Sequence, residues 1–177
     1  MGLPVTERLT LREFTAADLP DLVRLDTDPR VMRYIGDGRA LAESAVSDVL
    51  RRVQRYYTLY PDLGVWAAQR RVDGAFLGWF CLKYIPRTVE VEVGYRLMPD
   101  AWGNGYATEG ASALVRYGFE EVGLQRIVGL THPQNAASQH VLRKAGLRDA
   151  GYGHYYGLRL RYFVATAGPT LRPVPAS

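Results

Sequence analysis

The residues best suited to chemistry lie between Glu92 and Gly110, in the stretch EVGYRLMPDAWGNGYATEG. A carboxylate, Glu92, sits on a predicted strand, and a proline ends that strand before a glycine-rich turn opens a helix. Such a turn leaves backbone N–H groups unpaired at the positive end of the helix dipole, where they favour phosphate. It is not a G-x-G-x-x-G loop, which would need glycine at Thr108, and the Gly-Lys-Ser/Thr of the P-loop is absent. The turn therefore predicts phosphate binding and leaves the ligand open.

Length and composition limit the number of domains and the class of protein that this chain can form. The 177 residues, 47% hydrophobic and 23% charged, predict one globular domain over residues 1–167 and a flexible, proline-rich tail over residues 168–177. No apolar run reaches the ~18–20 residues that span a bilayer, and the first residues lack the apolar region of a signal peptide. The single cysteine, Cys81, excludes an internal disulfide and is consistent with a reducing compartment. We therefore expect a cytoplasmic protein with no membrane partner.

The positive charge is spread along the chain. The net charge of +4 comes from 20 arginines and two lysines against 18 acidic residues. The densest basic group, Arg51, Arg52 and Arg55, is not interleaved with aromatic residues. This pattern favours a solvated helix face over a nucleic-acid surface, so we expect no specific nucleic-acid partner. A mild positive excess also suits a small anionic ligand.

Hydrophobic periodicity predicts the elements that position the glycine turn. Strands are predicted at residues 8–14, 65–70, 75–85, 89–97, 125–131, 147–152 and 158–166, the second and third joined at Asp73-Gly74 and the last two separated by GHYYG. Helices are predicted from Thr15 to a stop at Asp28-Pro29, over residues 41–60, after the glycine turn, and from Pro133 and Asn135 to a cap at Gly146. The apolar run 75–85 indicates a central strand, and Gly94 indicates a bulge or a close backbone approach. This order predicts an α/β (α+β) fold with a mixed sheet and helices on its faces.

Four segments in this order resemble the GCN5-related N-acetyltransferases (GNAT), and within them the RimJ/RimL-like branch that acetylates ribosomal-protein N-termini. The segments are ERLTLREFTAADLPDL, WAAQRRVDGAFLGWFCL, EVGYRLMPDAWGNGYATEG and NAASQHVLRKAGL, and the resemblance covers residues 6–165. It implies a mixed, mostly antiparallel sheet of about seven strands, splayed between the fourth and fifth strands and flanked by about four helices. Trp102 departs from the Gln/Arg of the superfamily's loop pattern but resembles this branch, and Leu147 stands where phenylalanine is usual.

The resemblance implies an acetyl-CoA-dependent N-acetyltransferase. Acetyl-CoA is the expected cosubstrate, and the acceptor would be a primary amine, either a protein N-terminal α-amine or a small-molecule amine, acetylated by direct transfer in a ternary complex. The alternative is a non-catalytic acyl-CoA-binding sensor or scaffold module. No metal is expected, because His132, His140 and His154 lack a paired ligand spacing. Relatives often dimerise, so a homodimer is an open expectation, as are the acceptor's identity and the preferred acyl chain.

Glu92 is the expected general base, acting through water, because an ammonium must lose a proton before it attacks a thioester. The family commonly places a carboxylate at this position. Glu90, two residues away on the same face, is the competing choice. Either carboxylate could instead be solvent-facing or paired with an arginine.

The resemblance also implies an acid and a set of cofactor contacts. Ser138 matches the position expected to protonate the thiolate, although it could equally satisfy a backbone N–H at its helix start. Tyr152, Tyr155 and Tyr156 are the tyrosine alternatives for the acid. The expected cofactor-binding residues are Tyr95, Arg96 and Leu97 on the strand, Trp102, Gly103, Asn104, Gly105, Tyr106, Ala107 and Thr108 at the turn, and Asn135, Ser138, Arg143 and Lys144 on the later helix.

Acceptor specificity is expected in residues 28–60 and in the GHYYG segment. Arg30, Arg33 and Arg39 could receive an acidic acceptor or simply be solvated. The sequence does not decide between these readings.

Overall fold

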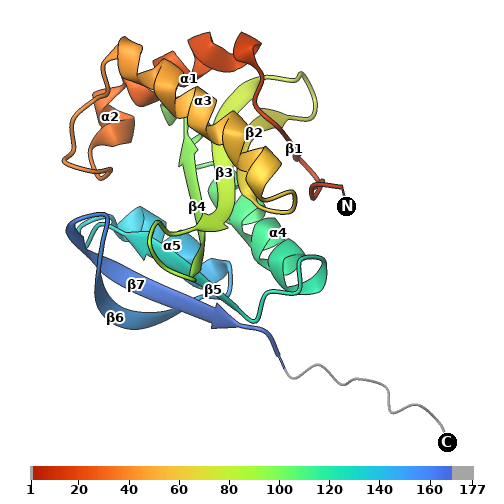
Figure 1. Cartoon of the computed structure of the whole chain (residues 1–177), viewed down its shortest axis with the longest axis vertical. Helices are drawn as coiled ribbons and strands as arrows, with labels where there is room; N and C mark the ends of the chain where they lie inside the picture. Colours follow the sequence, from red (N-terminus) through yellow and green to blue (C-terminus); the bar gives the residue numbers. More distant parts are fainter. Residues whose placement is uncertain (1, 169–177) are drawn as a thin grey trace, which may run out of the picture.

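A seven-stranded sheet forms the centre of the computed structural model, which describes residues 2–168 (Figure 1). The strands are β1 (Leu9–Arg12), β2 (Gly64–Arg70), β3 (Phe76–Tyr84), β4 (Val91–Leu97), β5 (Arg126–Thr131), β6 (Arg148–Tyr155) and β7 (Leu158–Thr166). Their order is β1-β2-β3-β4-β5-β7-β6, and every neighbouring pair is antiparallel except β4 and β5. The mixed, mostly antiparallel sheet is therefore confirmed. Apart from residue 168, the predicted tail lies outside the described residues.

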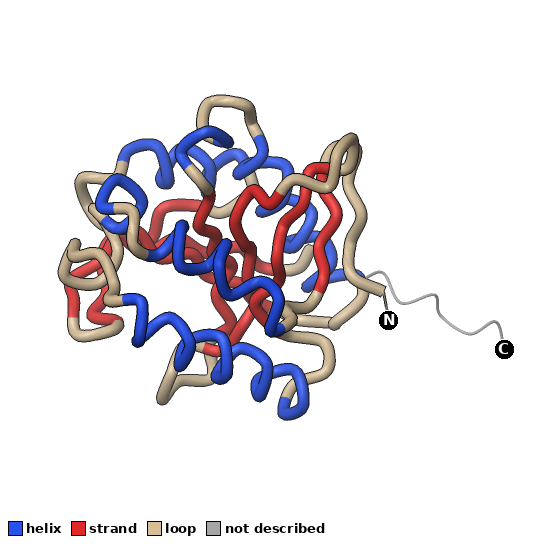
Figure 2. Tube along the Cα trace, turned by 90° about the horizontal axis from the view of Figure 1, so that it is seen from above, coloured by secondary structure: helices blue, strands red, loops and turns tan. Residues whose placement is uncertain are grey.

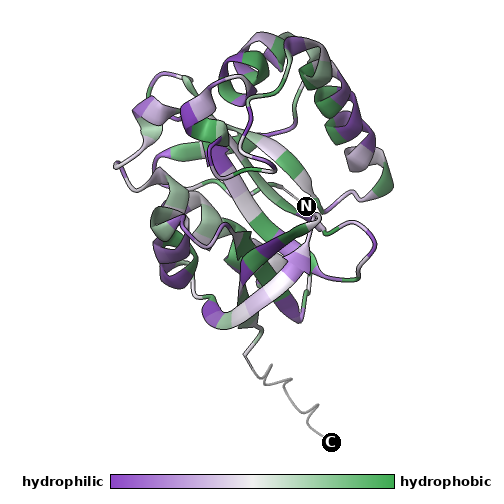
Figure 3. Cartoon of the chain, turned by 90° about the vertical axis from the view of Figure 1, so that its left-hand side faces the viewer, coloured by the Kyte–Doolittle hydropathy of each residue, from purple (hydrophilic) through white to green (hydrophobic). Residues whose placement is uncertain are grey.

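Helices cover both faces of this sheet (Figure 2). They are α1 (Leu19–Asp26), α2 (Pro29–Met32), α3 (Glu43–Leu59), α4 (Tyr106–Glu120) and α5 (Ala136–Lys144), with 3₁₀ turns η1 (Ala16–Asp18) and η2 (Pro99–Ala101). On one face, α4 and α5 pack on the larger core around Phe80, Leu114 and Leu142. On the other, α1 and α3 pack around Leu22 and Leu50. Apolar and polar residues alternate along these helices, the periodicity by which they were predicted (Figure 3).

The short helix α2 is a difference from the sequence prediction. The predicted stop at Asp28-Pro29 is confirmed, because α1 ends at Asp26, but the same pair also starts a second helix that was not predicted. The Asp28 side chain accepts a hydrogen bond from the Arg30 N–H at 2.8 Å, and Pro29 occupies the first helical position, where its missing N–H costs nothing. About four helices were predicted, and within residues 2–168 there are five α-helices.

The GHYYG segment is also different from its prediction, because most of it is strand. β6 continues to Tyr155, which pairs with Leu158, and the turn between them contains only Tyr156 and Gly157. Both turn residues have positive φ, +55° and +76°, as a two-residue hairpin turn requires. Tyrosine is an unusual residue for that conformation, which explains why the sequence did not reveal the turn.

The close backbone approach lies at Gly78 rather than at Gly94. A Cβ on Gly94 would meet the Cys81 sulfur at 3.0 Å, and the β3–β4 register is regular there. Gly78 has φ +132°, and a Cβ on it would lie 2.1 Å from the Arg96 carbonyl oxygen. The register shift of β2 occurs between Ala68, the partner of Gly78, and the following residue. Glycine at 78 thus lets β3 lie against β4, the strand that carries Glu92.

β4 and β5 separate almost as soon as they meet. Their only register pair within the described residues is Glu92 with Val128. Beyond this pair the two strands run in different directions (Figure 1), whereas β5 stays paired with β7 along its whole length. The predicted splay between the fourth and fifth strands is confirmed.

Within residues 2–168, no helix has the length and apolar character to cross a membrane.

We predict that Gly78→Ala destabilises the protein far more than Gly74→Ala. Gly74 also has a positive φ, +71°, but open space surrounds it. Left-handed strain alone costs about 1–2 kcal/mol, and the backbone clash at Gly78 adds to it, so we expect a loss of about 4 kcal/mol or more. Urea unfolding of both variants measures the difference, and equal losses would contradict the close approach of β3 and β4.

Candidate active site

The glycine turn presents a row of backbone N–H groups at the start of α4. Gly103 and Gly105 have φ of +76° and +82°, which glycine adopts without a Cβ penalty. Gly105 is the N-cap of the helix that begins at Tyr106. Within residues 2–168, the N–H groups of residues 103–107 meet no hydrogen-bond acceptor. Unpaired donors at the positive end of a helix are a site for phosphate.

The carbonyl side of the turn is occupied by the protein itself. Trp102 donates from Nε1 to the Leu97 carbonyl at 2.8 Å, and Asn104 donates from its side chain to the Trp102 carbonyl at 3.0 Å. Arg8 donates through Nη1 to the Asn104 carbonyl at 2.9 Å and through Nε to Glu109 at 2.7 Å. These bonds fix the turn from behind, so its N–H groups stay directed outward.

Backbone groups of β4 line the splayed edge beside the turn. Met98 donates its N–H to the Leu77 carbonyl at 2.9 Å, so even-numbered residues of β4 direct their peptide groups toward β3. Peptide groups alternate in direction along a strand, and Tyr95 and Leu97 therefore face the side from which β5 has diverged. The Leu97 carbonyl accepts a hydrogen bond from the Trp102 side chain. The N–H and C=O of Tyr95 and the N–H of Leu97 are left to meet an extended, amide-bearing ligand.

Glu92 lies at the point where β4 and β5 part, with only 8% of its surface exposed. Lys83, directly opposite on β3, and Tyr156, in the β6–β7 turn, both donate to its Oε1. Lys83 also donates to the Tyr156 hydroxyl at 2.8 Å. Burial alone would lower the pKa of Lys83, yet the adjacent Glu92 carboxylate raises it, which keeps the lysine charged. Glu92 is thus paired with a lysine, neither solvent-facing nor bound to an arginine.

Glu90 has a different environment from Glu92. Tyr155 donates to its Oε2 at 2.6 Å, Tyr162 donates to its Oε1, and Arg126 lies 3.8 Å from the same oxygen. Both carboxylate oxygens are therefore engaged by the β6–β7 hairpin. This arrangement suits a structural carboxylate that fastens the hairpin to β4, which makes Glu90 the poorer candidate base.

Ser138 lies across the splay from Glu92. The Asn135 side chain accepts from the Ser138 N–H at 3.1 Å, so the predicted N-cap of α5 is present. The Ser138 hydroxyl oxygen accepts from the Tyr95 hydroxyl at 3.2 Å, which leaves the serine proton to be donated elsewhere. Burial raises the pKa of Tyr95 to about 12, partly offset by the bond to Ser138. Tyr95 therefore orients the serine rather than acting as an acid itself.

The two candidate groups approach the splayed edge from opposite faces of the sheet. Tyr95 packs with Phe80 on the face covered by α4 and α5. Glu92, three positions earlier, points to the other face, as does Arg96, which binds Asp26 of α1. A group lying between β4 and β5 would thus have a carboxylate on one side and a hydroxyl donor on the other.

Several residues predicted to bind a cofactor have side chains engaged elsewhere. Arg96 forms a buried ion pair with Asp26 and lies over the Trp79 ring at 5.0 Å. Arg143 pairs with Asp149 at 3.3 Å. Lys144 is exposed and has no ion pair within residues 2–168. Ala107 and Thr108 are in the first turn of α4 as expected.

The arginines that could have received an acidic acceptor already have partners. Arg30 pairs with Asp28 at 2.6 Å, and Arg39 lies 3.8 Å from Asp37. Arg33 lies over the ring of the next residue. Their charge is largely compensated within the segment, which favours the solvated reading.

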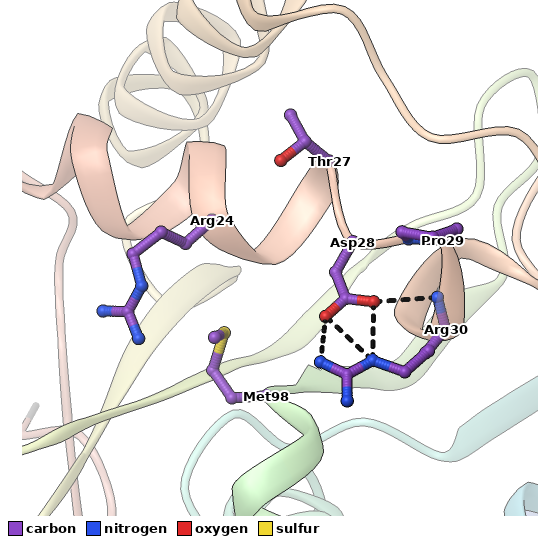
Figure 4. A pocket seen from close by; sticks show the side chains of 6 residues that line it. All are labelled: Arg24, Thr27, Asp28, Pro29, Arg30 and Met98. Carbon is purple, nitrogen blue, oxygen red and sulfur yellow. Dashed lines mark hydrogen bonds and ion pairs between the residues drawn. The ribbon is translucent and has the colours of Figure 1, made fainter.

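A hollow between α1, α2 and the end of β4 is lined by Arg24, Thr27, Asp28, Pro29, Arg30 and Met98 (Figure 4). The Asp28 carboxylate on its wall is bound to the Arg30 guanidinium and N–H. Met98 is six positions beyond Glu92, roughly 20 Å along an extended strand. The hollow therefore lies at the opposite end of β4 from the candidate base.

Two residues of the site were not predicted, Lys83 and Arg8. A lysine within the apolar run AFLGWFCLKYI was a usable signal, because lysine is seldom buried without a partner. Its partner followed only from the β3–β4 register. Arg8 carried no such signal, since nothing local connects it to a turn almost a hundred positions away.

A family model described as acetyltransferase (GNAT) domain matches residues 8–148. FsC-acetyl coenzyme A-N(2)-transacetylase from Aspergillus fumigatus is 38% identical over 144 residues, which cover 77% of this chain and 57% of that relative. The chain thus spans little more than half of the relative's length.

Solved structures share the fold. An acetyltransferase from Agrobacterium tumefaciens is 25% identical with a TM-score of 0.81, covering 94% of this chain and 95% of its own. RimL, a ribosomal L7/L12 alpha-N-protein acetyltransferase solved in complex with coenzyme A, has a TM-score of 0.76 at 16% identity, with coverages of 93% and 97%.

We predict that Arg96→Met costs stability rather than cofactor affinity. The Asp26 side chain is 1% exposed, and removing its partner leaves a buried, uncompensated charge. Such losses are about 3–5 kcal/mol. Denaturant unfolding measures the loss, and calorimetric titration with coenzyme A at a temperature where the variant is folded should give an unchanged affinity. A large loss of affinity in the folded variant would restore Arg96 to the cofactor site.

Proposed function

Because this chain belongs to the acetyltransferase (GNAT) family and is an N-acetyltransferase, we propose that it moves the acetyl group of acetyl-CoA directly onto a primary amine within a ternary complex. The observation that carries the proposal is the arrangement of Glu92 and Ser138 on opposite faces of the splayed edge. An amine and a leaving thiol would each meet one proton-handling group there.

The cofactor side of this site is built mainly from backbone. The five N–H groups of residues 103–107 would hold the pyrophosphate, and glycine at 103 and 105 allows the chain to approach it closely. The peptide groups of Tyr95 and Leu97 would bind the pantetheine amides as a neighbouring strand would. Trp102 supports the turn through Leu97. Acetyl-CoA supplies the activated acetyl group as a thioester.

Glu92 removes a proton from the ammonium form of the acceptor, directly or through water, so that the nitrogen lone pair can attack the carbonyl carbon. The N–C bond forms and the C–S bond breaks. Ser138 donates its proton to the departing sulfur and is reprotonated at the expense of the nitrogen. The ammonium nitrogen starts with three protons. Glu92 removes one, a second replaces the proton that Ser138 gave to the thiol, and the third stays on the amide nitrogen.

Direct transfer is supported by the state of the only cysteine. Cys81 is 2% exposed, and burial raises the pKa of its thiol to about 12. A protonated, buried thiol is a poor nucleophile, so an acetyl-cysteine intermediate is disfavoured. The acetyl group then passes straight to the amine.

The names of two similar proteins support the proposed class of acceptor, although the two acceptors differ. One specifies an N(2) position and the other the alpha-amine of a ribosomal protein. Both are acetylated at nitrogen, which supports a primary amine, either a protein N-terminal α-amine or a small-molecule amine. Release of free thiol from acetyl-CoA across peptides, amino acids, polyamines and aminoglycosides tests this class, and no release with any amine would favour an acyl-CoA-binding sensor or scaffold.

We predict that Glu92→Gln lowers turnover by about 10²-fold or more, because the base is lost. Affinity for coenzyme A should stay nearly the same, since the cofactor turn is untouched. Glu90→Gln is the matched control and should keep most of the turnover. Thiol release and calorimetric titration measure the two effects, and unchanged turnover in Glu92→Gln would remove Glu92 as the base.

Initial velocities measured while both acetyl-CoA and the amine are varied should give intersecting double-reciprocal lines. This pattern is expected because both substrates must occupy the site before the acetyl group moves. Parallel lines, together with an acetylated protein trapped in the absence of amine, would point to a covalent intermediate instead.

A further inference from the structure

The hydrogen bonds to Glu92 are unevenly divided between its two oxygens. Lys83 and Tyr156 both donate to Oε1, and Lys83 also donates to the Tyr156 hydroxyl. Within residues 2–168, no donor binds Oε2, and that oxygen is not fully enclosed. One oxygen is therefore held while the other keeps its lone pairs.

Tyr156 is held in a conformation that costs stability. Its φ is +55° in the two-residue turn between β6 and β7, where glycine or asparagine is the ordinary choice. A bulky side chain in the left-handed region is uncommon and points to a constraint other than folding. The residue is 47% exposed, so the burial of apolar surface does not explain its retention. Its hydroxyl, however, reaches Glu92 and Lys83.

Lys83 places a charge where the chain otherwise buries apolar groups. It lies on β3 between Leu82 and Tyr84, and its side chain is 23% exposed. It is one of only two lysines beside 20 arginines, so the compact ammonium is not the chain's usual cation. An ammonium can donate to two neighbouring oxygens from one point, as Lys83 does to Glu92 and Tyr156.

We propose that Lys83 and Tyr156 are positioning residues that hold Glu92 through Oε1 and leave Oε2 to take the proton from the acceptor amine. This inference rests on the proposed function, because it assigns how the proposed base is held. Tyr156 in this role is a donor to the carboxylate and not the acid that protonates the thiolate. Burial and the adjacent Glu92 raise the pKa of the Tyr156 phenol, consistent with a fixed donor.

The charged and titratable groups around Glu92 agree with this assignment. From β3, Lys83 is its partner, and Cys81 is a protonated thiol with a raised pKa. From α3, Tyr56 faces Lys83, and burial raises the pKa of that phenol as well. From β5 and β7, the nearest groups are Arg126 and the Tyr162 hydroxyl, which are engaged with the other carboxylate of β4. Lys83 is therefore the cation that contacts Glu92.

The test of Lys83 compares kcat with KM in the full chain. With the most active amine of the acceptor panel, Lys83→Met should lower kcat by about ten-fold, because the carboxylate loses a donor that orients it. The KM for acetyl-CoA should stay nearly the same, since the cofactor turn is untouched. Lys83→Arg keeps a charged donor and should recover part of the turnover.

The test of Tyr156 separates the backbone strain of its positive φ from the role of its hydroxyl group. Tyr156→Asn suits the left-handed turn, so it should melt no lower than Tyr156→Phe, which keeps the strain and loses the hydroxyl. Both should lower turnover by about ten-fold, because the carboxylate loses a donor that orients it. A stable Tyr156→Asn with wild-type turnover would overturn the role of Tyr156. So would a Tyr156→Asn that melts well below Tyr156→Phe, since the tyrosine would then serve the fold.

A folded Lys83→Met with wild-type kcat would overturn the role of Lys83. A second measurement needs no acceptor: the ¹³C carboxyl signal of Glu92, identified by its absence in Glu92→Gln, should change its chemical shift in Lys83→Met, because a hydrogen bond to Oε1 is lost. If Glu92→Gln keeps its turnover while this signal still moves in Lys83→Met, Lys83 holds Glu92 and the assignment of the base has failed.

Discussion

The rest of the structure depends on the single point at which β4 and β5 pair. Glu92 and Val128 are in register, and beyond them the strands part while β5 follows β7 instead. Where two neighbouring strands separate, peptide groups that would ordinarily be paired are exposed. Such a gap in the sheet is stable only if other contacts hold the two strands together at the point where they still pair. That end carries two carboxylates, each bound to a tyrosine of the β6–β7 hairpin, so that the hairpin and β5 are fastened to β4 where they first meet.

Several arginines of this protein stabilise the fold through hydrogen bonds and ion pairs within the chain. Arg8 donates to the Asn104 carbonyl of the glycine turn and pairs with Glu109, and Arg96 pairs with Asp26. Arg143 pairs with Asp149. The anion-binding role that we propose for the turn would then fall to N–H groups, whose direction is set by glycine conformations. A net charge of +4 carries little information about such a role, because these arginines are paired within the protein.

The sequence predicted what is local and missed what depends on register. The glycine turn, the Asn135 cap and the succession of strands along the chain follow from residue types within a few positions of one another, and these predictions are confirmed. The pairing of Lys83 with Glu92 follows from the alignment of two strands, which no local signal fixes. The reach of Tyr156 to the same carboxylate needs both a hairpin and its turn conformation. The α2 helix was missed for another reason, because Asp-Pro can end one helix or start the next.

The two sides of the proposed site are built from different parts of the chain, so they should respond differently to substitution. The proposed coenzyme A side is made of peptide groups, whose direction is set by Gly103, Gly105 and the start of α4, so most side chains around it could change without altering it. The proposed acceptor side depends on side chains of β3, β4 and the β6–β7 turn. Glu92 lies where the two sides meet, because it belongs to the strand beside the glycine turn and is bound by a residue of the hairpin turn.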